Sequence, residues 1–424
     1  MRIIHTSDWH LGQNFYGYDR AREHRAMVDQ LKELILEQKP DLLVIAGDIY
    51  DAASPGANVQ KQFCGYILEL KQVAPHMPVV CISGNHDSSS RHEIFQQPWE
   101  ALNVYMIGKV DMNDLRNNII KIGNTKGYVV AVPYTNERFL DADFYKRLEE
   151  AVKEVTAADN RNEEGVGAGV GAGVDAGVDA GADAGVDAGA GAGVDVRMDL
   201  PVIYVGHAAI QGCNFAGHSN LNDRYIGGIE CTSIEELGDG YDYIALGHIH
   251  KAQTFGQGRA RYCGSPLPVG FDEVRPDYIH GFSVVEILPG EVPYIENIPV
   301  ETPNPLVNIP AEGYAPWKEV MDELKRFPAD LPAYIRLNVL LKDNEMLPYD
   351  KEAQIKGALE GKQGKYALIN PARELSEMDS QKGDQMRSLS MEELQRVEPA
   401  TILKEYAKLS GHLFTEDFEK CSKR

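Results

Sequence analysis

The sequence predicts an α/β fold, in which parallel strands are joined by helices, and three observations lead to this prediction. The apolar run at 42–46, LLVIA, is typical of a strand that is buried on both faces. Residues 22–38 before it repeat apolar side chains at the three- and four-residue spacing of a helix. Residues 3–4 begin an earlier short strand. A strand, a helix and a strand in this order form a βαβ unit, whose two strands run parallel.

The apolar runs that follow extend this pattern along the chain to about residue 300. We expect a helix at 59–73, a strand at 79–82, a hairpin of strands at 119–122 and 128–132, a helix at 138–155, strands at 201–205, 243–246 and near 262, and an antiparallel pair at 282–287 and 292–298. Together these elements predict a first domain over residues 1–300.

The segment at 165–196 differs from its surroundings, because Gly and Ala dominate it and Asp recurs in it. It has no aromatic residue and little apolar bulk to offset the entropy of ordering, so we expect a disordered surface loop. A calcium-binding repeat and a silk-like assembly segment are the alternatives. The first of these requires a GGxGxDxUx spacing, which this segment lacks.

The remainder of the chain is expected to form a small module and a tail. The proline-spaced stretch at 302–316 is typical of a linker. Helices at 317–327 and 350–359 and strands at 333–341 and 365–370 predict an α+β module. The tail at 390–424 has helical spacing with one apolar face. Two hypotheses remain open for that face: it packs on its own domain, or it docks on the helices of a partner.

The composition is that of an ordinary globular protein, since 43% of the 424 residues are hydrophobic and 25% are charged. No run of about eighteen apolar residues and no export signal is present, so we expect neither a membrane span nor secretion. The six cysteines include no CxxC pair, which favours free thiols in a reducing cytoplasm. The net charge of −22 disfavours a general nucleic-acid surface. A nuclease with this charge would need metal ions, a local basic groove or a basic partner.

Polar side chains with metal-binding chemistry follow five of the predicted strands, and most of these clusters come directly after a glycine. In two clusters, Asp8 with His10 and His248 with His250, the side chains are two residues apart, which places both on one face of an extended chain. Ligands bind at the carboxyl edge of an α/β sheet, so the clusters are expected to meet there. The candidate residues are Asp8, His10, Asp48, Asn85, His86, His207, His248 and His250.

The donor types in these clusters indicate the chemistry. Carboxylate, imidazole and amide oxygen without thiolate suit manganese, iron or zinc. Seven such ligands are too many for one ion but fit two if one carboxylate, that of Asp48, bridges them. Two cations about 3.5 to 4 Å apart can activate a water and neutralise charge on a phosphoryl group. The sequence therefore predicts hydrolysis of a phosphate ester.

The order of the clusters resembles that of a known family. Longer runs, such as LGHIHKAQ at 246–253 and YCGSPLP at 262–268, are similar to the nuclease subunits of bacterial two-subunit repair nucleases. The resemblance implies a β-sandwich flanked by helices, with a small capping domain at 301–380 and C-terminal helices. Five motifs occur in the order of the calcineurin-like metallophosphoesterases: Asp8-x-His10, Gly47-Asp48-x-x-Asp51, Gly84-Asn85-His86-Asp87, Gly206-His207 and Gly247-His248-x-His250.

The resemblance also implies a role for each candidate residue and a pair of divalent ions, with manganese favoured. His86 would bind no metal but would face the phosphate, stabilising charge or protonating the leaving oxygen, with Asp87 as its orienting partner. The metal ligands would fall into two sets: Asp8, His10, His250 and a bridging Asp48 for one ion, and Asp48, Asn85, His207 and His248 for the other.

By the same resemblance, the chain would be a DNA nuclease, a 3′–5′ double-strand exonuclease and a single-strand and hairpin endonuclease, in repair, recombination and replication. Its partner would be an ABC-type ATPase with a long coiled coil, with two copies of each chain in the complex. The alternative is a two-metal phosphodiesterase or phosphatase for a small substrate, which would not need the 124 residues after residue 300. A binding module that had lost its chemistry would lack ligands, and none is missing.

Overall fold

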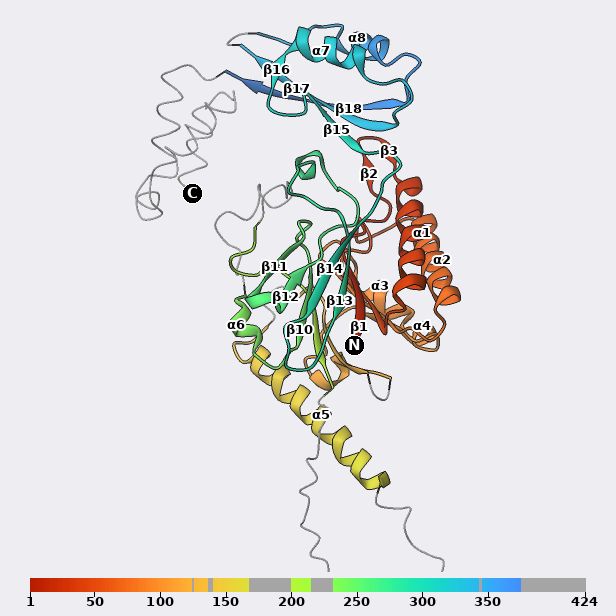
Figure 1. Cartoon of the computed structure of the whole chain (residues 1–424), viewed down its shortest axis with the longest axis vertical. Coiled ribbons are helices and arrows are strands. Elements are labelled where there is room, and N and C mark those ends of the chain that lie inside the picture. Colours follow the sequence, from red (N-terminus) through yellow and green to blue (C-terminus); the bar gives the residue numbers. More distant parts are fainter. Residues whose placement is uncertain (124–125, 136–139, 168–199, 215–231, 343–344, 375–424) are drawn as a thin grey trace, which may run out of the picture. The chain divides into compact units, whose positions relative to one another are not determined.

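The computed structural model (Figure 1) describes residues 1–123, 126–135, 140–167, 200–214, 232–342 and 345–374. The chain divides into two compact units. The first unit comprises Met1–Asn308, Pro328–Arg336 and Gly361–Leu368, and it holds every candidate site residue. The second comprises Ile309–Phe327, Leu337–Glu360 and Ile369–Arg424.

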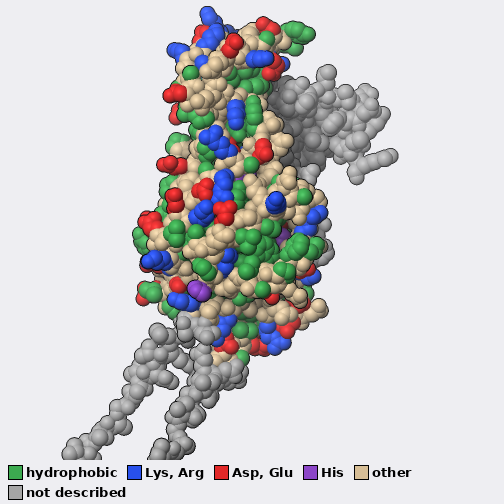
Figure 2. Space-filling model, turned by 90° about the vertical axis from the view of Figure 1, so that its right-hand side faces the viewer, with side chains coloured by type: hydrophobic (Ala, Val, Ile, Leu, Met, Phe, Trp, Pro, Cys, Tyr) green, Lys and Arg blue, Asp and Glu red, His purple; other side chains and the backbone are tan. Residues whose placement is uncertain are grey.

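The exposed surface carries charges of both signs. On the face shown in Figure 2, Lys and Arg side chains lie between Asp and Glu side chains and form no large uniform patch. Within the described ranges, no helix combines the length and the apolar character needed to cross a bilayer.

The first of two six-stranded sheets is built around the predicted βαβ unit. Strands β1 (Arg2–Thr6) and β4 (Leu42–Ala46) are paired in parallel, as predicted. The antiparallel pair β13 and β14 lies at one edge of the sheet. The strand order is β14-β13-β1-β4-β5-β6, and the remaining bounds are β5 Val79–Ile82, β6 Val104–Ile107, β13 Gly281–Glu286 and β14 Tyr294–Pro299.

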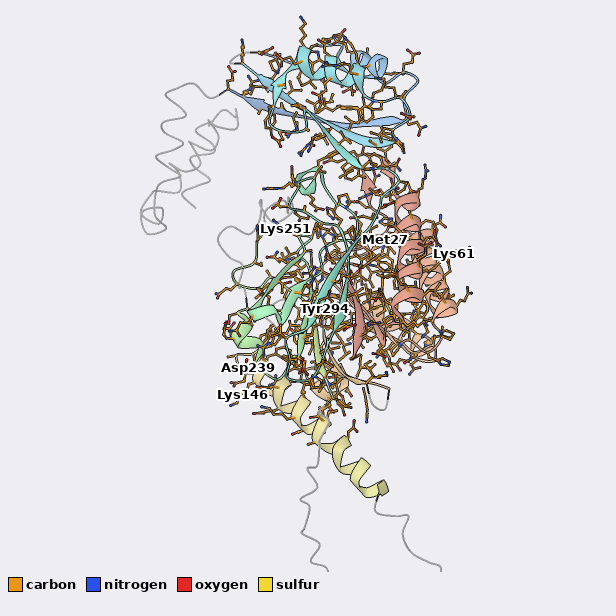
Figure 3. All side chains as sticks on the ribbon, viewed as in Figure 1. Met27, Lys61, Lys146, Asp239, Lys251 and Tyr294 are labelled. Carbon is orange, nitrogen blue, oxygen red and sulfur yellow. The ribbon has the colours of Figure 1, made fainter. Side chains whose placement is uncertain are left out.

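Helices α1 (Ala21–Gln38) and α2 (Ala57–Val73) cover one face of the first sheet (Figure 1). Met27 of α1, labelled in Figure 3, and Phe63 of α2 are buried in one cluster with Ile45 of β4. The apolar residues whose spacing predicted these helices therefore form the stripe that the helices bury against the sheet.

The second sheet lies against the other face of the first. Helix α5 (Phe144–Gly167) covers the outer face of the second sheet, where Phe144 and Leu148 are buried. The strand order is β11-β12-β10-β9-β8-β7, and the bounds are β7 Ile119–Ile122, β8 Gly127–Val132, β9 Val202–His207, β10 Tyr243–Gly247, β11 Gln253–Phe255 and β12 Ala260–Tyr262. Strands β8, β9, β10 and β12 are parallel.

The core between the sheets explains why β4 is apolar at every position. Leu42 and Val44 face the second sheet, where they pack with residues such as Val205, whereas Leu43 and Ile45 face the helices. A strand that is buried on both faces has no place for a polar residue.

Two polar links also cross the core between the sheets. His5 of β1 is hydrogen-bonded through Nδ1 to the hydroxyl of Tyr243 in β10 at 2.9 Å. The Nε of Arg261 in β12 donates to the hydroxyl of Ser283 in β13 at 2.8 Å. Both links are buried, so they help to fix the register between the two sheets.

Several short elements lie in the connections between the strands of these sheets, and a further sheet includes strands of the second unit. The connections are β2 Asn14–Phe15, β3 Tyr18–Asp19, α3 Ser89–Ile94, α4 Gln96–Glu100, α6 Ile234–Leu237 and the 3-10 helices Leu115–Asn118, Gly256–Gly258 and Phe271–Glu273. The four-stranded sheet has the order β15-β17-β16, with β18 also paired to β17. Its elements are β15 Leu306–Ile309, β16 Ala315–Pro316, α7 Trp317–Arg326, β17 Ala333–Leu341, α8 Lys351–Ala358 and β18 Gly364–Arg373.

The predicted α/β fold, a β-sandwich flanked by helices, is confirmed. The helix predicted at 138–155 is wrong in its bounds, because it begins at Phe144 and continues to Gly167. The sequence analysis also missed β6 and the short helices α3 and α4, which are too short for a clear apolar period. The disordered loop predicted at 165–196 is wrong at its first three residues, because α5 continues through them to Gly167. The rest of that segment and the tail at 390–424 lie outside the described residues. The division into domains of 1–300 and 301–380 stays a prediction.

The buried His5 generates a prediction about stability and pH. Burial, together with the nearby Arg261, lowers the pKa of His5 from 6.5 to about 3. The unfolded chain therefore takes up this proton first as the pH falls. His5 favours folding above pH 6.5, and this contribution decreases towards pH 3 by about 1.4 kcal/mol per pH unit.

The His5→Gln variant should consequently lose less stability on acidification than the wild type. The free energy of unfolding, measured in urea between pH 7.5 and 4.5, checks this expectation. Replacement of the exposed His76 by Gln is the matched control. Parallel stability curves for wild type and His5→Gln would contradict the prediction.

Candidate metal centre

All eight candidate residues come together at one end of the sandwich. Asp8 and His10 follow β1, and Asp48 follows β4. Asn85 and His86 follow β5, His207 is the last residue of β9, and His248 and His250 follow β10. The first sheet therefore supplies the carboxylates and the amide, and the second sheet supplies three histidines.

The loops after β1 and β4 run side by side beyond the end of the sheet. The backbone N–H of Asp8 donates to the carbonyl of Gly47 at 3.0 Å, and that of His10 donates to the carbonyl of Asp48 at 3.1 Å. These hydrogen bonds continue the parallel pairing of the two strands, so they hold the two carboxylate-bearing loops in fixed register.

Strained backbone is concentrated in this region. Asp8, His10, Asp48 and His248 all have positive φ, at 53°, 47°, 46° and 96°. Positive φ is uncommon for residues other than glycine and costs about 1–3 kcal/mol where the conformation is unfavourable. Such strain persists where surrounding contacts impose it, and it is typical of ligand-binding sites.

The glycines before the site residues are required by close packing. A Cβ atom on Gly84 would lie 2.1 Å from Oδ1 of Asp48, and one on Gly47 would lie 2.2 Å from Nδ1 of His207. A Cβ atom on Gly247 would lie 1.9 Å from the carbonyl oxygen of Ala46. A side chain at Gly47 or Gly247 would therefore push the strand ends of the two sheets apart, and one at Gly84 would displace Asp48 within the first sheet.

One group of potential ligand atoms comes from Asp8, His10 and His250, whose atoms lie within 4.8 Å of one another. The Nε2 atoms of His10 and His250 are 3.3 Å apart. Oδ1 of Asp8 is 4.0 Å from Nε2 of His250. The two imidazoles and the carboxylate thus face one common point.

A second group comprises Asp8, Asp48 and His207, which also lie within 4.8 Å of one another. Nδ1 of His207 donates to the carbonyl of Ala46 at 2.8 Å, so its Nε2 faces Oδ2 of Asp48 at 3.4 Å. Asn85 joins this side, because its Oδ1 lies 3.0 Å from Nε2 of His207 and 3.0 Å from Nδ1 of His248.

Asp48 faces both groups, since its Oδ2 is also 4.0 Å from Nε2 of His10. Asp8, however, is the residue common to these two groups, and a third group of possible ligand atoms comes from His10, Asp51 and His86. The geometry places both carboxylates between the histidines of the two sides. A bridging role for Asp48 is compatible with this arrangement and stays a prediction.

The electrostatics of the site favour a cation. Asp8 and Asp48 are 1% and 2% exposed, and neither forms an ion pair with a Lys or Arg of the described chain. Burial raises the pKa of Asp8 to about 6. Burial also acts to raise the pKa of Asp48, but His207 and His10 outweigh it and hold that pKa below its usual range.

The histidines respond in the opposite direction. Burial acts to lower the pKa of His207, yet the charge of Asp48 outweighs it and raises the pKa to about 9. The pKa of His10 is likewise raised to about 9 against the effect of burial, by Asp51 and Asp48. The two buried carboxylates thus favour the protonated, positively charged form of the histidines beside them. The oxygen and imidazole donors of the site fit divalent ions such as manganese, iron or zinc.

Two acidic residues that the candidate set did not include position these histidines. Oε1 of the buried Glu273 is hydrogen-bonded to Nδ1 of His250 at 2.7 Å, and its Oε2 accepts from the backbone N–H of Val269. Oδ1 of Asp51 lies 3.3 Å from Nδ1 of His10. Such partners orient the imidazole so that Nε2 faces the ion. Asp51 could have been found from its motif, whereas no pattern in the sequence marks Glu273.

The expectation that Asp87 orients His86 is wrong. The carboxylate of Asp87 accepts the backbone N–H groups of Ile49, Tyr50 and Gly84, at 3.1, 3.0 and 2.9 Å. Nδ1 of His86 instead donates to the carbonyl oxygen of Asp51 at 2.9 Å. Asp87 points back into the loops because their otherwise unpaired N–H groups need an acceptor there.

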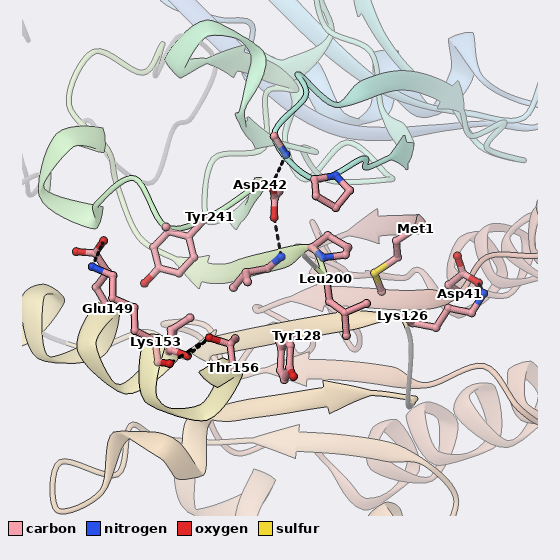
Figure 4. A pocket seen from close by; sticks show the side chains of 16 residues that line it. Met1, Asp41, Lys126, Tyr128, Glu149, Lys153, Thr156, Leu200, Tyr241 and Asp242 are labelled. Carbon is pink, nitrogen blue, oxygen red and sulfur yellow. Dashed lines mark hydrogen bonds and ion pairs between the residues drawn. The ribbon is translucent and has the colours of Figure 1, made fainter. Parts of the chain in front are cut away.

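The chain also has a pocket of about 810 Å³ at the other end of the sandwich (Figure 4). Met1, Asp41, Pro201 and Asp242 line it, and they precede β1, β4, β9 and β10. The candidate site residues follow the carboxyl ends of the same strands. This pocket is therefore separate from the metal centre.

Comparison with known proteins agrees with this geometry. Residues 1–165 match the family described as calcineurin-like phosphoesterase. The matched residues include Asp8, His10, Asp48, Asn85 and His86, and this family of phosphoesterases implies divalent metal ions.

Over a larger part of its length, the chain is similar to the D subunits of the bacterial nuclease SbcCD. It is 28% identical to that of Rhodobacter capsulatus over 77% of this chain and 76% of the relative. It is 28% identical to that of Escherichia coli K12 over 93% and 91%, and 26% identical to that of Bacillus subtilis over 81% and 80%. The resemblance inferred from the motifs, and with it a phosphodiester hydrolase, is confirmed.

Removal of the Glu273 carboxylate should weaken metal binding. In Glu273→Gln the imidazole of His250 loses an anionic partner, so affinity for manganese should fall about 10- to 100-fold. Isothermal titration with manganese measures this change. Asp277→Asn, a change at a more exposed carboxylate that pairs with Lys251, is the control. Equal affinities of wild type and Glu273→Gln would show that Glu273 does not support the site.

A methyl group on Gly84 should disrupt the site, because it would meet Oδ1 of Asp48 at 2.1 Å. The Gly84→Ala variant should retain less than half of the wild-type metal content, measured by mass spectrometry after dialysis. Gly65→Ala in α2 is the control, since nothing lies within 4 Å of its added Cβ. Full metal occupancy in Gly84→Ala would contradict the packing argument.

Proposed function

We propose that this chain is the nuclease subunit of a complex that cleaves DNA with two divalent metal ions, manganese being favoured. The observation that carries the proposal is the convergence of two buried carboxylates with histidines and an asparagine from both sheets. The activities proposed are 3′–5′ double-strand exonuclease and single-strand or hairpin endonuclease. They would serve DNA repair, recombination and replication.

We assign the metal ligands to two sets. Asp8, His10 and His250 would hold one ion, and Asn85, His207 and His248 the other, with Asp48 between them. When bound, the ions supply an activated water and neutralise charge on the phosphoryl group. Glu273 and Asp51 keep the Nε2 atoms of His250 and His10 directed into the site.

His86 would act on the leaving group. Its backbone N–H donates to Oδ1 of Asp48 at 2.8 Å, and its Nδ1 donates to the carbonyl of Asp51. Its ring meets that of His10 edge to face, with the centroids 4.9 Å apart. An imidazole held in this way can protonate a leaving oxygen or stabilise charge on it.

The charge of the chain supports a role for a partner. A net charge of −22 and the mixed surface in Figure 2 provide little general attraction for DNA. The relatives are named as subunits of SbcCD, so we propose the coiled-coil ABC-type ATPase SbcC as the partner, with two copies of each chain in a cytoplasmic complex. The ATPase would supply basic surface.

The alternative, a phosphodiesterase or phosphatase for a small substrate, is not favoured. The similarity to the Escherichia coli nuclease subunit extends over 93% of the chain, well beyond residue 300. A minimal phosphatase would not need that extension. A module without chemistry is also disfavoured, because the chain has a suitable donor side chain at every predicted ligand position.

Two experiments test the proposal. The wild-type chain with manganese should cleave a labelled hairpin duplex, and hydrolysis of bis(4-nitrophenyl) phosphate without DNA cleavage would instead favour the small-substrate alternative. His86→Asn should lower the rate of cleavage about 10²- to 10⁴-fold at unchanged metal content. The exposed His76→Asn is the control. Loss of metal from His86→Asn would make His86 a ligand and its proposed role wrong.

A further inference from the structure

Tyr134 lies beside the candidate metal centre and belongs to none of the motifs. It follows β8, and its backbone N–H donates to the carbonyl of Ser83 at 2.9 Å. Ser83 is two residues before Asn85. This hydrogen bond therefore ties the end of β8 to the loop that carries Asn85 and His86.

The ring of Tyr134 lies against two of the site histidines. Its centroid is 6.3 Å from that of His207, with an interplanar angle of 83°, and 6.5 Å from that of His248, with an angle of 31°. Edge-to-face and offset arrangements at such distances are favourable for aromatic rings. Tyr134 thus forms a wall of the site on the side of His207 and His248.

About a third of this wall is exposed to solvent. Tyr134 is 36% exposed, whereas His207 beneath it is 1% exposed. Several other described aromatic residues are more exposed, among them Tyr294 at 66%, but their rings are not in contact with the site histidines. The exposed third of Tyr134 therefore lies at the edge of a polar site, where a bound ligand can reach the ring.

The chemistry of a DNA strand matches this arrangement. A scissile phosphate in the metal centre is flanked by nucleosides, and each base has a flat face of about the size of a tyrosine ring. Stacking of a base on an aromatic side chain is largely independent of base identity. A base in a duplex already stacks on its neighbours, so an unpaired base is the one free to stack on Tyr134.

We propose that Tyr134 stacks on an unpaired base next to the phosphate that is cleaved, and that it selects single-stranded or hairpin-loop DNA over small phosphodiesters. This inference rests on the proposed nuclease function and adds a substrate-binding residue to it. Stacking on a base requires only the aromatic ring, so a phenylalanine at position 134 should serve as well as the tyrosine.

The test compares the full-length variants Tyr134→Ala, Tyr134→Phe and Tyr134→Leu with the wild type. KM and kcat are measured with manganese for a labelled hairpin with an unpaired loop and for bis(4-nitrophenyl) phosphate. Tyr134→Ala and Tyr134→Leu should raise KM for the hairpin roughly 5- to 100-fold. Tyr134→Phe should stay within about twofold of wild type. The ratio of kcat/KM for hairpin over small substrate should fall accordingly. Tyr294→Ala is the control.

A spectroscopic readout accompanies the kinetics. A hairpin with 2-aminopurine in its loop is bound with calcium in place of manganese. The wild type and Tyr134→Phe should quench the probe at saturating protein. Tyr134→Ala should leave it at least twofold brighter.

Three results would overturn the inference: an unchanged KM for the hairpin in Tyr134→Ala, an equal defect in Tyr134→Phe, or an equal loss on both substrates. The second would assign the effect to the hydroxyl, and the third to support of the histidines. A wild-type chain that hydrolyses the small substrate and spares DNA would refute the proposed function, and the stacking role with it. That outcome differs from a failure of Tyr134 alone, in which the wild type still cleaves DNA.

Discussion

The site depends on two buried carboxylates that lie close together. No lysine or arginine of the described chain is paired with them. Asp8 and Asp48 lie within 4.8 Å of His207 through their ligand atoms. Their charge raises the pKa of His207 and His10, although burial acts in the opposite direction. Buried charge of one sign is costly unless it is compensated. The histidines supply part of this compensation, and divalent ions, which the similarity to metallophosphoesterases implies, would supply more.

The sandwich makes this concentration of charge possible. In each sheet the strands that precede the site residues are parallel, so the polar residues after their carboxyl ends gather at one end of the sandwich. Glycines 47, 84 and 247 let the two strand ends approach to distances that no Cβ atom would allow. The positive φ values of Asp8, His10, Asp48 and His248 then aim the side chains at a common point. The stability of the apolar core between the sheets sustains this local strain.

The site also depends on groups that do not themselves face an ion. The carbonyl of Ala46 holds His207, Glu273 holds His250, and Asp87 holds the loops after β4 and β5 together. Each of these contacts joins segments that are far apart in the sequence or lie on different loops. The contacts of Ala46 and Glu273 use Nδ1 of His207 and His250, so that Nε2 of each ring faces the site, and such contacts set the geometry and basicity of a metal site. Asp87 faces the loops and not His86 because its carboxylate accepts backbone N–H groups of those loops.

The sequence by itself determined the longer strands and helices of the first unit and marked the candidate residues that the structure brings together. Buried strands and amphipathic helices have fixed periods, and each ligand follows an apolar run, usually after a glycine. The tertiary structure alone decided the contacts of Glu273, the partner of Asp87, and the position of Tyr134 against His207 and His248. It also decided the bounds of α5 and the short helices. These features lie in loops or short segments without periodicity, and they arise only when two sheets pack and bring distant residues within hydrogen-bonding distance.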